Sequence, residues 1–293
     1  MTYPSSHAIT FKCERETLVG VLHLPPEAYA TIGIVIVVGG PQYRAGSHRQ
    51  FVTSARHFAR AGYPVIRFDC RGMGDSDGTF PGFEHIDADI SAAISCLQQH
   101  APGISGVMLW GLCDAASACL IYGNRRDERV KGLVLANPWV RTEETVAKTY
   151  LRHYYFQRLL QKSFWSRLLT AKFNPLLSLR ELLENVNRTI QHEQPQDTLD
   201  ERNYLARMLS GLRIFSKPML LLLSDRDLTA KEFADFCARQ HEWSQLLERK
   251  NVIWKTVSDS DHTFSGKLAQ QQADDLCTQW LAQTALLFSD TLA

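Results

Sequence analysis

Short apolar runs of strand-like composition alternate with helix-like segments along most of the chain, and this alternation restricts the fold more than any other feature. The strand-like runs lie at 34–38, 64–69, 107–110, 130–136, 218–223 and 251–257. Continuous β-branched and aliphatic runs are typical of strands buried on both faces. Helical patterns lie at 48–61, 83–100, 231–248 and 267–287. The alternation predicts an α/β fold with a mainly parallel sheet, helices on both faces and an early antiparallel strand at 17–24.

The alternation stops between residues 142 and 215, where helical patterning without strands takes over. Open α/β sheets bind ligands at the carboxyl ends of their strands. We therefore expect this segment to be a helical cap over that edge of the sheet. The predicted organisation is a first core part at 1–141, the cap insertion at 142–215 and a second core part at 216–293.

The composition is that of an ordinary soluble globular protein, with 45% hydrophobic and 22% charged residues. A net charge of +1 excludes a global field that would attract nucleic acid or anionic lipid. The apolar stretches at 32–38 and 219–223 are far shorter than the roughly 20 residues of a membrane helix. The N-terminus does not have the pattern of a signal peptide. We expect no nucleic-acid partner and no membrane span.

The chain has seven cysteines, at positions 13, 70, 96, 113, 119, 237 and 277. Their number is odd and no two of them form Cys-x-x-Cys, so neither a disulfide framework nor a structural zinc site is expected. We expect most of these thiols to be small core side chains in a reducing compartment. No metal and no cofactor are predicted.

Residues 107–117 have the order of parts of a nucleophile elbow: an apolar strand, Gly111, Cys113, Ala115 and then a helix of small residues. Small residues two before and two after the nucleophile prevent clashes in the tight strand-to-helix turn. Cys113 is therefore the candidate nucleophile. The alternative is a core cysteine in a plain βα turn, because Gly-x-Cys-x-Ala is a short pattern.

The position of Cys113 has opposing electrostatic effects. Unpaired N–H groups at a helix N-terminus stabilise a thiolate, and the N–H of Asp114 would point at a developing oxyanion. The Asp114 carboxylate disfavours the thiolate because it carries the same charge. The sequence leaves open which effect prevails.

Two partners follow Cys113 in the chain order that this elbow requires. Asp227 is the predicted acid, since it lies three residues after Ser224 at the end of a late strand; Asp225 is the alternative, and the other carboxylate would then be a cap or turn residue. His262 is the predicted base, in the loop between the last strand and the last helix. In these roles the cysteine attacks a carbonyl, the histidine moves the proton and the aspartate orients the histidine.

The second oxyanion donor is expected after the strand at 34–38, where the sequence reads Gly39-Gly40-Pro41-Gln42-Tyr43. Pro41 occupies the usual donor position and has no N–H. The donor is then the N–H or side-chain amide of Gln42, or the N–H of Tyr43.

Arg44, His48 and Arg49 follow closely and are candidates for contact with an anionic substrate group, Arg44 and His48 in particular; the alternative is solvated residues at a helix start. The segment 69–76, Asp-Cys-Arg-Gly-Met-Gly-Asp-Ser, has two glycines but lacks Gly-Lys-Ser/Thr and a third glycine, so it is not interpreted as a phosphate-binding loop. We interpret it as a tight loop that supports the elbow.

Together these pieces resemble the α/β-hydrolase superfamily over nearly the whole chain. Four segments look like the exosortase A system-associated hydrolases of the first type: Gly-Gly-Pro-Gln-Tyr-Arg at 39–44, Gly-Ser-His-Arg-Gln-Phe at 46–51, Arg-Phe-Asp-Cys-Arg-Gly-Met-Gly-Asp-Ser at 67–76 and Gly-Leu-Cys-Asp-Ala-Ala-Ser at 111–117. The resemblance implies a cytoplasmic bacterial enzyme linked to exopolysaccharide production and protein sorting. A cysteine nucleophile on this fold is also similar to dienelactone hydrolases, which hydrolyse, and to polyester synthases, which transfer acyl groups.

Three functions are compatible with the sequence. The first is hydrolysis of an ester or thioester of a small acyl substrate through Cys113, Asp227 and His262. The second is acyl transfer from the same acyl-thioenzyme to another nucleophile. The third is ligand binding without catalysis, because a fold does not fix a function.

Overall fold

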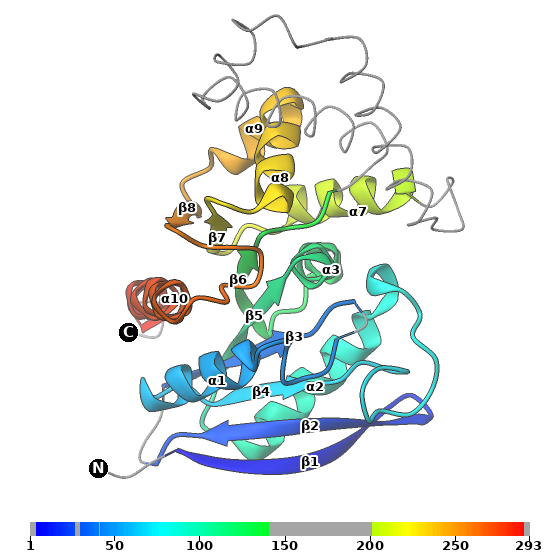
Figure 1. Ribbon diagram of the computed structural model, residues 1–293. Helices are drawn as coiled ribbons and strands as arrows, with labels where there is room; N and C mark the ends of the chain where they lie inside the picture. The colour runs from blue at the N-terminus through cyan, green and yellow to red at the C-terminus, as the bar shows by residue number, and fades with distance from the viewer. Residues whose placement is uncertain (1–3, 27–29, 41, 141–200, 290–293) are drawn as a thin grey trace, which may run out of the picture.

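The six runs predicted as strands all belong to one sheet, with the run at 251–257 at its edge. The structure is a computed structural model and describes residues 4–26, 30–40, 42–140 and 201–289, of which 201–203 and 285–289 without side chains. Within these residues the sheet has eight strands in the order β1-β2-β4-β3-β5-β6-β7-β8 (Figure 1). Their bounds are β1 Ser5–Cys13, β2 Glu16–Leu24, β3 Ile32–Val37, β4 Val65–Phe68, β5 Gly106–Leu112, β6 Val130–Ala136, β7 Met219–Ser224 and β8 Val252–Val257.

All strand pairs from β4 to β8 are parallel, whereas β1 pairs with β2 and β2 with β4 in antiparallel orientation. Every residue of β3, β4 and β5 is buried. The predicted mainly parallel sheet and its early antiparallel strand are thus confirmed, and the α/β-hydrolase fold with them.

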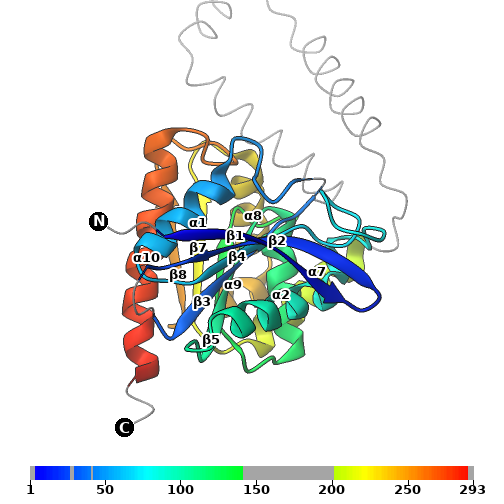
Figure 2. The same cartoon turned by 90° about the horizontal axis from the view of Figure 1, so that it is seen from below.

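Helices cover both faces of the sheet. Their bounds are α1 Gln50–Arg60, α2 Asp87–His100, α3 Asp114–Tyr122, α7 Glu201–Ile214, α8 Leu228–Arg239, α9 His241–Leu247 and α10 Lys267–Ser289, with short 3₁₀ turns η1 Phe83–His85 and η2 Gly123–Arg125. Helices α1 and α10 lie together on one side of the sheet, and α2, α3 and α7 lie on the other (Figures 1 and 2). None of the helices in the described residues is long and apolar enough to cross a membrane.

Three elements differ from the sequence-based expectation. Strand β1 was not predicted, because its polar side chains are mostly exposed and only Cys13 is buried, so it has no apolar run. The helix predicted at 231–248 is two helices, α8 and α9, separated by the extended backbone of Gln240. The helix predicted from residue 83 starts with the turn η1, and α2 follows it.

The predicted cap insertion lies mostly outside the described residues, so the division into core and cap stays a prediction. Its described part, α7, packs directly on α3. Asn124 ties the two helices together, since its side-chain amide donates to the carbonyl oxygens of Ile121 and Arg207, both at 2.8 Å. Gly211 lies at the closest approach.

Gly211→Ala is expected to destabilise the α3–α7 contact. A Cβ at this position would lie 1.9 Å from the backbone carbonyl oxygen of Leu120, so the two helices would have to separate. Overpacking of this kind costs about 2 kcal/mol, and calorimetric unfolding measures it as a lower melting temperature. Gly266→Ala is the matched control, since its Cβ would make only an ordinary contact at 3.8 Å. Equal melting temperatures for the two variants would contradict this expectation.

Candidate active site

Cys113 lies on a strained turn between β5 and α3. Its φ of 62° and ψ of −127° are unusual for a residue with a side chain. A Cβ at Gly111 would lie 2.5 Å from the carbonyl oxygen of Ala115, so only glycine fits two residues before the cysteine. Cys113 is partly exposed, whereas the other six cysteines are buried and all seven are free thiols. This is the geometry that the elbow pattern predicts.

His262 and Asp227 reach the same edge of the sheet from two different loops. Asp227 follows β7 and is nearly buried, with its side chain 7% exposed. It accepts a hydrogen bond from Nδ1 of His262 at 2.8 Å. The His262 ring also hydrogen-bonds with the Cys113 side chain. The structure thus brings together the three residues that the sequence predicted as acid, base and nucleophile.

The charge on His262 depends on these two partners. Burial lowers the pKa of the imidazole, but hydrogen bonds with Asp227 and Cys113 and the attraction of their charges raise it to about 10. An imidazolium beside the Cys113 sulfur is the arrangement that favours a thiolate nucleophile.

Asp227 also begins α8. Its carboxylate accepts hydrogen bonds from the backbone N–H groups of Thr229 at 3.1 Å and Ala230 at 3.0 Å. These N-cap hydrogen bonds hold the Asp227 carboxylate in place while one of its oxygens faces His262. Asp225, the alternative acid, instead accepts hydrogen bonds from the N–H groups of Asp259 and Ser260, both at 3.0 Å, and so supports the loop that leads to His262.

Asn137 is a further residue of this edge that sequence reasoning missed. It is fully buried at the end of β6, in a left-handed conformation with φ of 43°. Its side-chain amide donates to the backbone oxygen of His262 at 2.9 Å and to Ser224 Oγ at 3.0 Å, and its Oδ1 accepts the Ser224 N–H at 2.8 Å. Asn137 therefore fixes the loop between β8 and α10, which carries His262 and is called the histidine loop below, to the sheet. A polar residue directly after a buried strand was the signal that could have found it.

The loop after β3 wraps the Asp114 side chain. A Cβ at Gly39 would lie 2.0 Å from Asp114 Oδ1, so this close approach requires glycine. The carboxylate accepts hydrogen bonds from the N–H groups of Gly40 and Ala115. Burial raises the pKa of the Asp114 carboxyl to about 6, although these N–H groups, its own N–H and the nearby His262 act to lower it.

The backbone N–H and the side-chain amide of Gln42, two of the candidates for the second oxyanion donor, differ in their hydrogen bonding. The Gln42 N–H donates to the carbonyl oxygen of Gly40 at 2.8 Å, so it is already engaged. The Gln42 side chain has a buried Oε1 that meets no hydrogen-bond donor. Of the three alternatives for the second donor, the Gln42 N–H is thus the least available in this conformation.

The family described as serine aminopeptidase, S33, matches residues 31–232 of the chain, which is more than half of its 293 residues. The chain belongs to this family. The protein is accordingly an α/β-hydrolase-fold hydrolase. The family description names a serine enzyme, whereas this hydrolase has a cysteine at the elbow.

Solved structures with the same fold include two esterases. The Pyrococcus furiosus esterase Pf2001 matches with a TM-score of 0.64 and 15% identity over 96% of this chain and 94% of its own. Est1E from Butyrivibrio proteoclasticus, with bound ferulic acid, matches with a TM-score of 0.60 and 16% identity over 94% and 99%. At this identity the likeness shows the fold alone. No curated protein matches the hydrolase in sequence.

Arg44 of this hydrolase is engaged by two carboxylates. Its guanidinium forms ion pairs with buried Asp69 and, at 2.8 Å, with Asp75, and it lies over the Tyr43 ring at 4.3 Å. An anionic substrate group would have to compete with both carboxylates, so the role of Arg44 in substrate binding stays a prediction. Asp69 also accepts the N–H of Arg44 at 2.6 Å, and Asp75 accepts the Tyr43 hydroxyl at 2.6 Å, so the segment 69–76 supports the loop after β3.

His48 of the hydrolase is exposed and lies against the histidine loop. Its Nε2 is 2.9 Å from the carbonyl oxygen of Thr263, next to His262. The contact joins the loop after β3 to the loop that carries the predicted base. Its proposed contact with substrate likewise stays a prediction.

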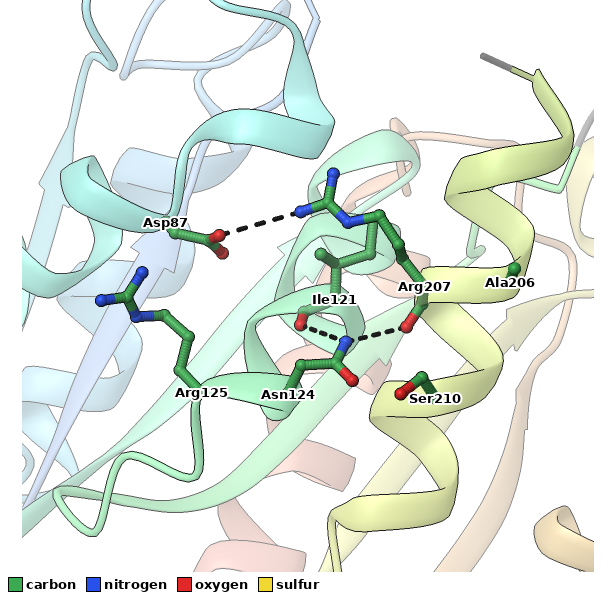
Figure 3. A pocket seen from close by; sticks show the side chains of 7 residues that line it. All are labelled: Asp87, Ile121, Asn124, Arg125, Ala206, Arg207 and Ser210. Atoms are coloured by element: carbon green, nitrogen blue, oxygen red, sulfur yellow. Dashed lines mark hydrogen bonds and ion pairs between the residues drawn. The ribbon is translucent and has the colours of Figure 1, made fainter. Parts of the chain in front are cut away.

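A hollow of about 270 Å³ lies near the far end of α3 (Figure 3). Arg125 and Arg207 both reach toward Asp87 there, with Arg207 Nη2 3.8 Å from the carboxylate. Ile121, which lines the hollow, is eight positions after Cys113, so the hollow lies roughly 12 Å along the helix from the elbow. Its lining is Asp87, Ile121, Asn124, Arg125, Ala206, Arg207 and Ser210. Within the described residues no group of His, Cys, Asp and Glu side chains is arranged to hold a metal ion.

Proposed function

We propose that the protein hydrolyses an ester or thioester of a small acyl substrate through a covalent bond to Cys113. The observation that carries this proposal is the hydrogen-bonded series Asp227–His262–Cys113 at the carboxyl edge of the sheet. The strained elbow exposes the sulfur, and the other six thiols are buried.

The reaction has two steps. In the first, the Cys113 sulfur attacks the acyl carbonyl carbon, a C–S bond forms, the bond to the leaving group breaks and His262 gives its proton to that group. In the second, water attacks the thioester, His262 takes the proton from water and the C–S bond breaks. Asp227 holds the imidazole in the orientation that both steps require. The N–H of Asp114 donates to the oxyanion in each step.

The exosortase association and the cytoplasmic location belong to the same proposal. The exosortase association is supported by the sequence resemblance of segments 39–44, 46–51, 67–76 and 111–117. The location is supported by the same resemblance and by the seven free thiols. The acyl group and the leaving group are open within the ester and thioester class.

Mass spectrometry of the protein after exposure to short-chain aryl esters and acyl-CoA analogues tests the covalent step. We expect one acyl adduct, located on Cys113 and removed slowly by water. An adduct on another residue would overturn the assignment of the nucleophile. Product partition in the presence of alcohol or amine acceptors then separates hydrolysis from acyl transfer: transfer products in excess of hydrolysis would favour an acyltransferase.

A further inference from the structure

The carboxylate of Asp114 lies where backbone N–H groups converge beside the nucleophile. The N–H of Ala115, in the first turn of α3, donates to Asp114 Oδ1 at 2.9 Å, and Gly40, from the loop after β3, lies against Oδ2 of the same carboxylate. The N–H groups of Gly40 and of Asp114 itself also act to lower the pKa of this carboxyl. Successive N–H groups at a helix N-terminus and in a turn form a site for an anion. Here the anion that fills it belongs to the protein.

This anion site overlaps the place where the oxyanion of an acyl intermediate is expected. The Asp114 N–H is the predicted first oxyanion donor, and the loop after β3 is the predicted source of the second. Asp114 Oδ1 occupies the space that a Cβ at position 39 would need, so only glycine fits there and the loop is shaped around the carboxylate. The ionisable side chains that interact with the carboxylate are His262 and Cys70, in addition to its neighbour Cys113.

We propose that the Asp114 carboxylate is the resident anion of the oxyanion site, and that an acyl oxyanion binds there only after the carboxylate has been neutralised or displaced. The proposal rests on the proposed function for the identity of the incoming oxyanion. It does not rest on that function for the existence of the anion site.

Charge is the physical reason for the exclusion. Two negatively charged oxygens cannot share the same few N–H donors without strong repulsion. When Asp114 takes up one proton from solvent, its charge disappears and the N–H groups hold it less tightly. Burial raises the pKa of this carboxyl to about 6, so the neutral form gains population as the pH falls below that value.

Alkylation of Cys113 with two reagents of similar size tests this proposal without acyl turnover. Iodoacetate carries a carboxylate and iodoacetamide does not; in both cases the sulfur forms a C–S bond and iodide leaves. The rate constant for iodoacetate divided by that for iodoacetamide reports whether an anion is accepted beside the sulfur. In the wild-type protein we expect a low ratio at pH 7.5 that rises as the pH falls through about 6.

Two substitutions of Asp114 distinguish the effect of removing its charge from the effect of emptying the anion site. Asp114→Asn leaves a neutral acceptor on the N–H groups, and Asp114→Ala leaves the groups without an acceptor. We expect the ratio at pH 7.5 to rise by about tenfold in the asparagine variant, to rise further in the alanine variant, and to lose its dependence on pH near 6 in both. In the alanine variant, added formate should slow the reaction with iodoacetate.

Asp259→Asn is the matched control, because it removes an exposed carboxylate from the histidine loop and asparagine tolerates the positive φ of 52° there. We expect it to leave the ratio unchanged. A purely structural role for Asp114 would change both rates together and leave the ratio constant, and that result would overturn the proposal. If the ratio changes as expected in a protein that shows no acyl turnover, the anion site stands and the proposed function fails.

Discussion

Cys113→Ala is expected to lower the turnover of an aryl ester or acyl thioester by at least about 10³-fold. The substitution removes the sulfur that we propose forms the acyl bond, and what activity remains would come from substrate binding and the oxyanion donors alone. Alanine is smaller than cysteine and the thiol is partly exposed, so we expect the fold to persist. The measurement is kcat/KM, with thermal unfolding as the check that the fold persists.

Cys113→Ser sharpens this test. It keeps the size of the side chain and replaces the thiol with the residue that the family description names. Activity between that of wild type and Cys113→Ala is expected, because a serine hydroxyl needs more activation by His262 than a thiol does. Cys119→Ala, in a fully buried thiol of α3, is the matched control that removes a different sulfur. Wild-type turnover in Cys113→Ala would reject Cys113 as the nucleophile.

Asp227→Asn is expected to have the second-largest effect, a loss of about 10³ to 10⁴ in kcat. An amide cannot stabilise the imidazolium, and it favours the wrong orientation of the ring proton. The pKa of His262 should fall from about 10 toward its ordinary value, because the hydrogen bond and charge of Asp227 are among the causes that raise it. Titration of the His262 ring by NMR measures this shift directly.

The sign of the pH effect on stability follows from the same shift. A raised folded-state pKa means that protonated His262 stabilises the fold fully below pH 6.5 and that this stabilisation disappears as the pH rises toward 10. In Asp227→Asn the stabilisation by protonated His262 should disappear at lower pH, because the pKa of the ring is less raised. Unfolding free energies measured across this range would contradict the assignment if the two proteins changed in parallel.

Asp227→Ala separates the two roles of this residue. Alanine removes the N-cap of α8 as well as the partner of His262, and loss of a cap costs about 1 kcal/mol. Asparagine keeps an oxygen that can accept from Thr229 and Ala230. Lower thermal stability in the alanine variant, with the same loss of activity in both, is the expected pattern.

Much of the fold could be predicted because burial on both faces leaves a strong sequence signal. The runs that became β3 and β5 are apolar throughout and fully buried, and β4 is also fully buried, with Arg67 as its one charged residue. Strand β1 has no such run: it pairs with β2 at the edge of the sheet, and most of its side chains are exposed. The break at Gln240 left no proline or glycine signal, and only the packing of two separate helices shows it.

The choice between Asp225 and Asp227 illustrates what depends on tertiary contacts. Both carboxylates follow β7, and spacing alone favours Asp227 without excluding Asp225. The structure distinguishes them by their partners, since Asp227 meets the His262 ring and Asp225 meets backbone N–H groups. Asn137 is similar, because its role lies in contacts with residues more than 80 positions away in sequence.

The sequence by itself predicted most of the strands and helices and the chain order of Cys113, Asp227 and His262, because hydrophobic period and spacing can be read along the chain. Only the tertiary structure decided which N–H groups face which carboxylate. The sequence left the effect of Asp114 on the site open; the fold directs its side chain onto the N–H groups of Gly40 and Ala115. The physical reason is that hydrogen bonding and burial depend on distances between segments, and those distances exist only once the sheet has formed.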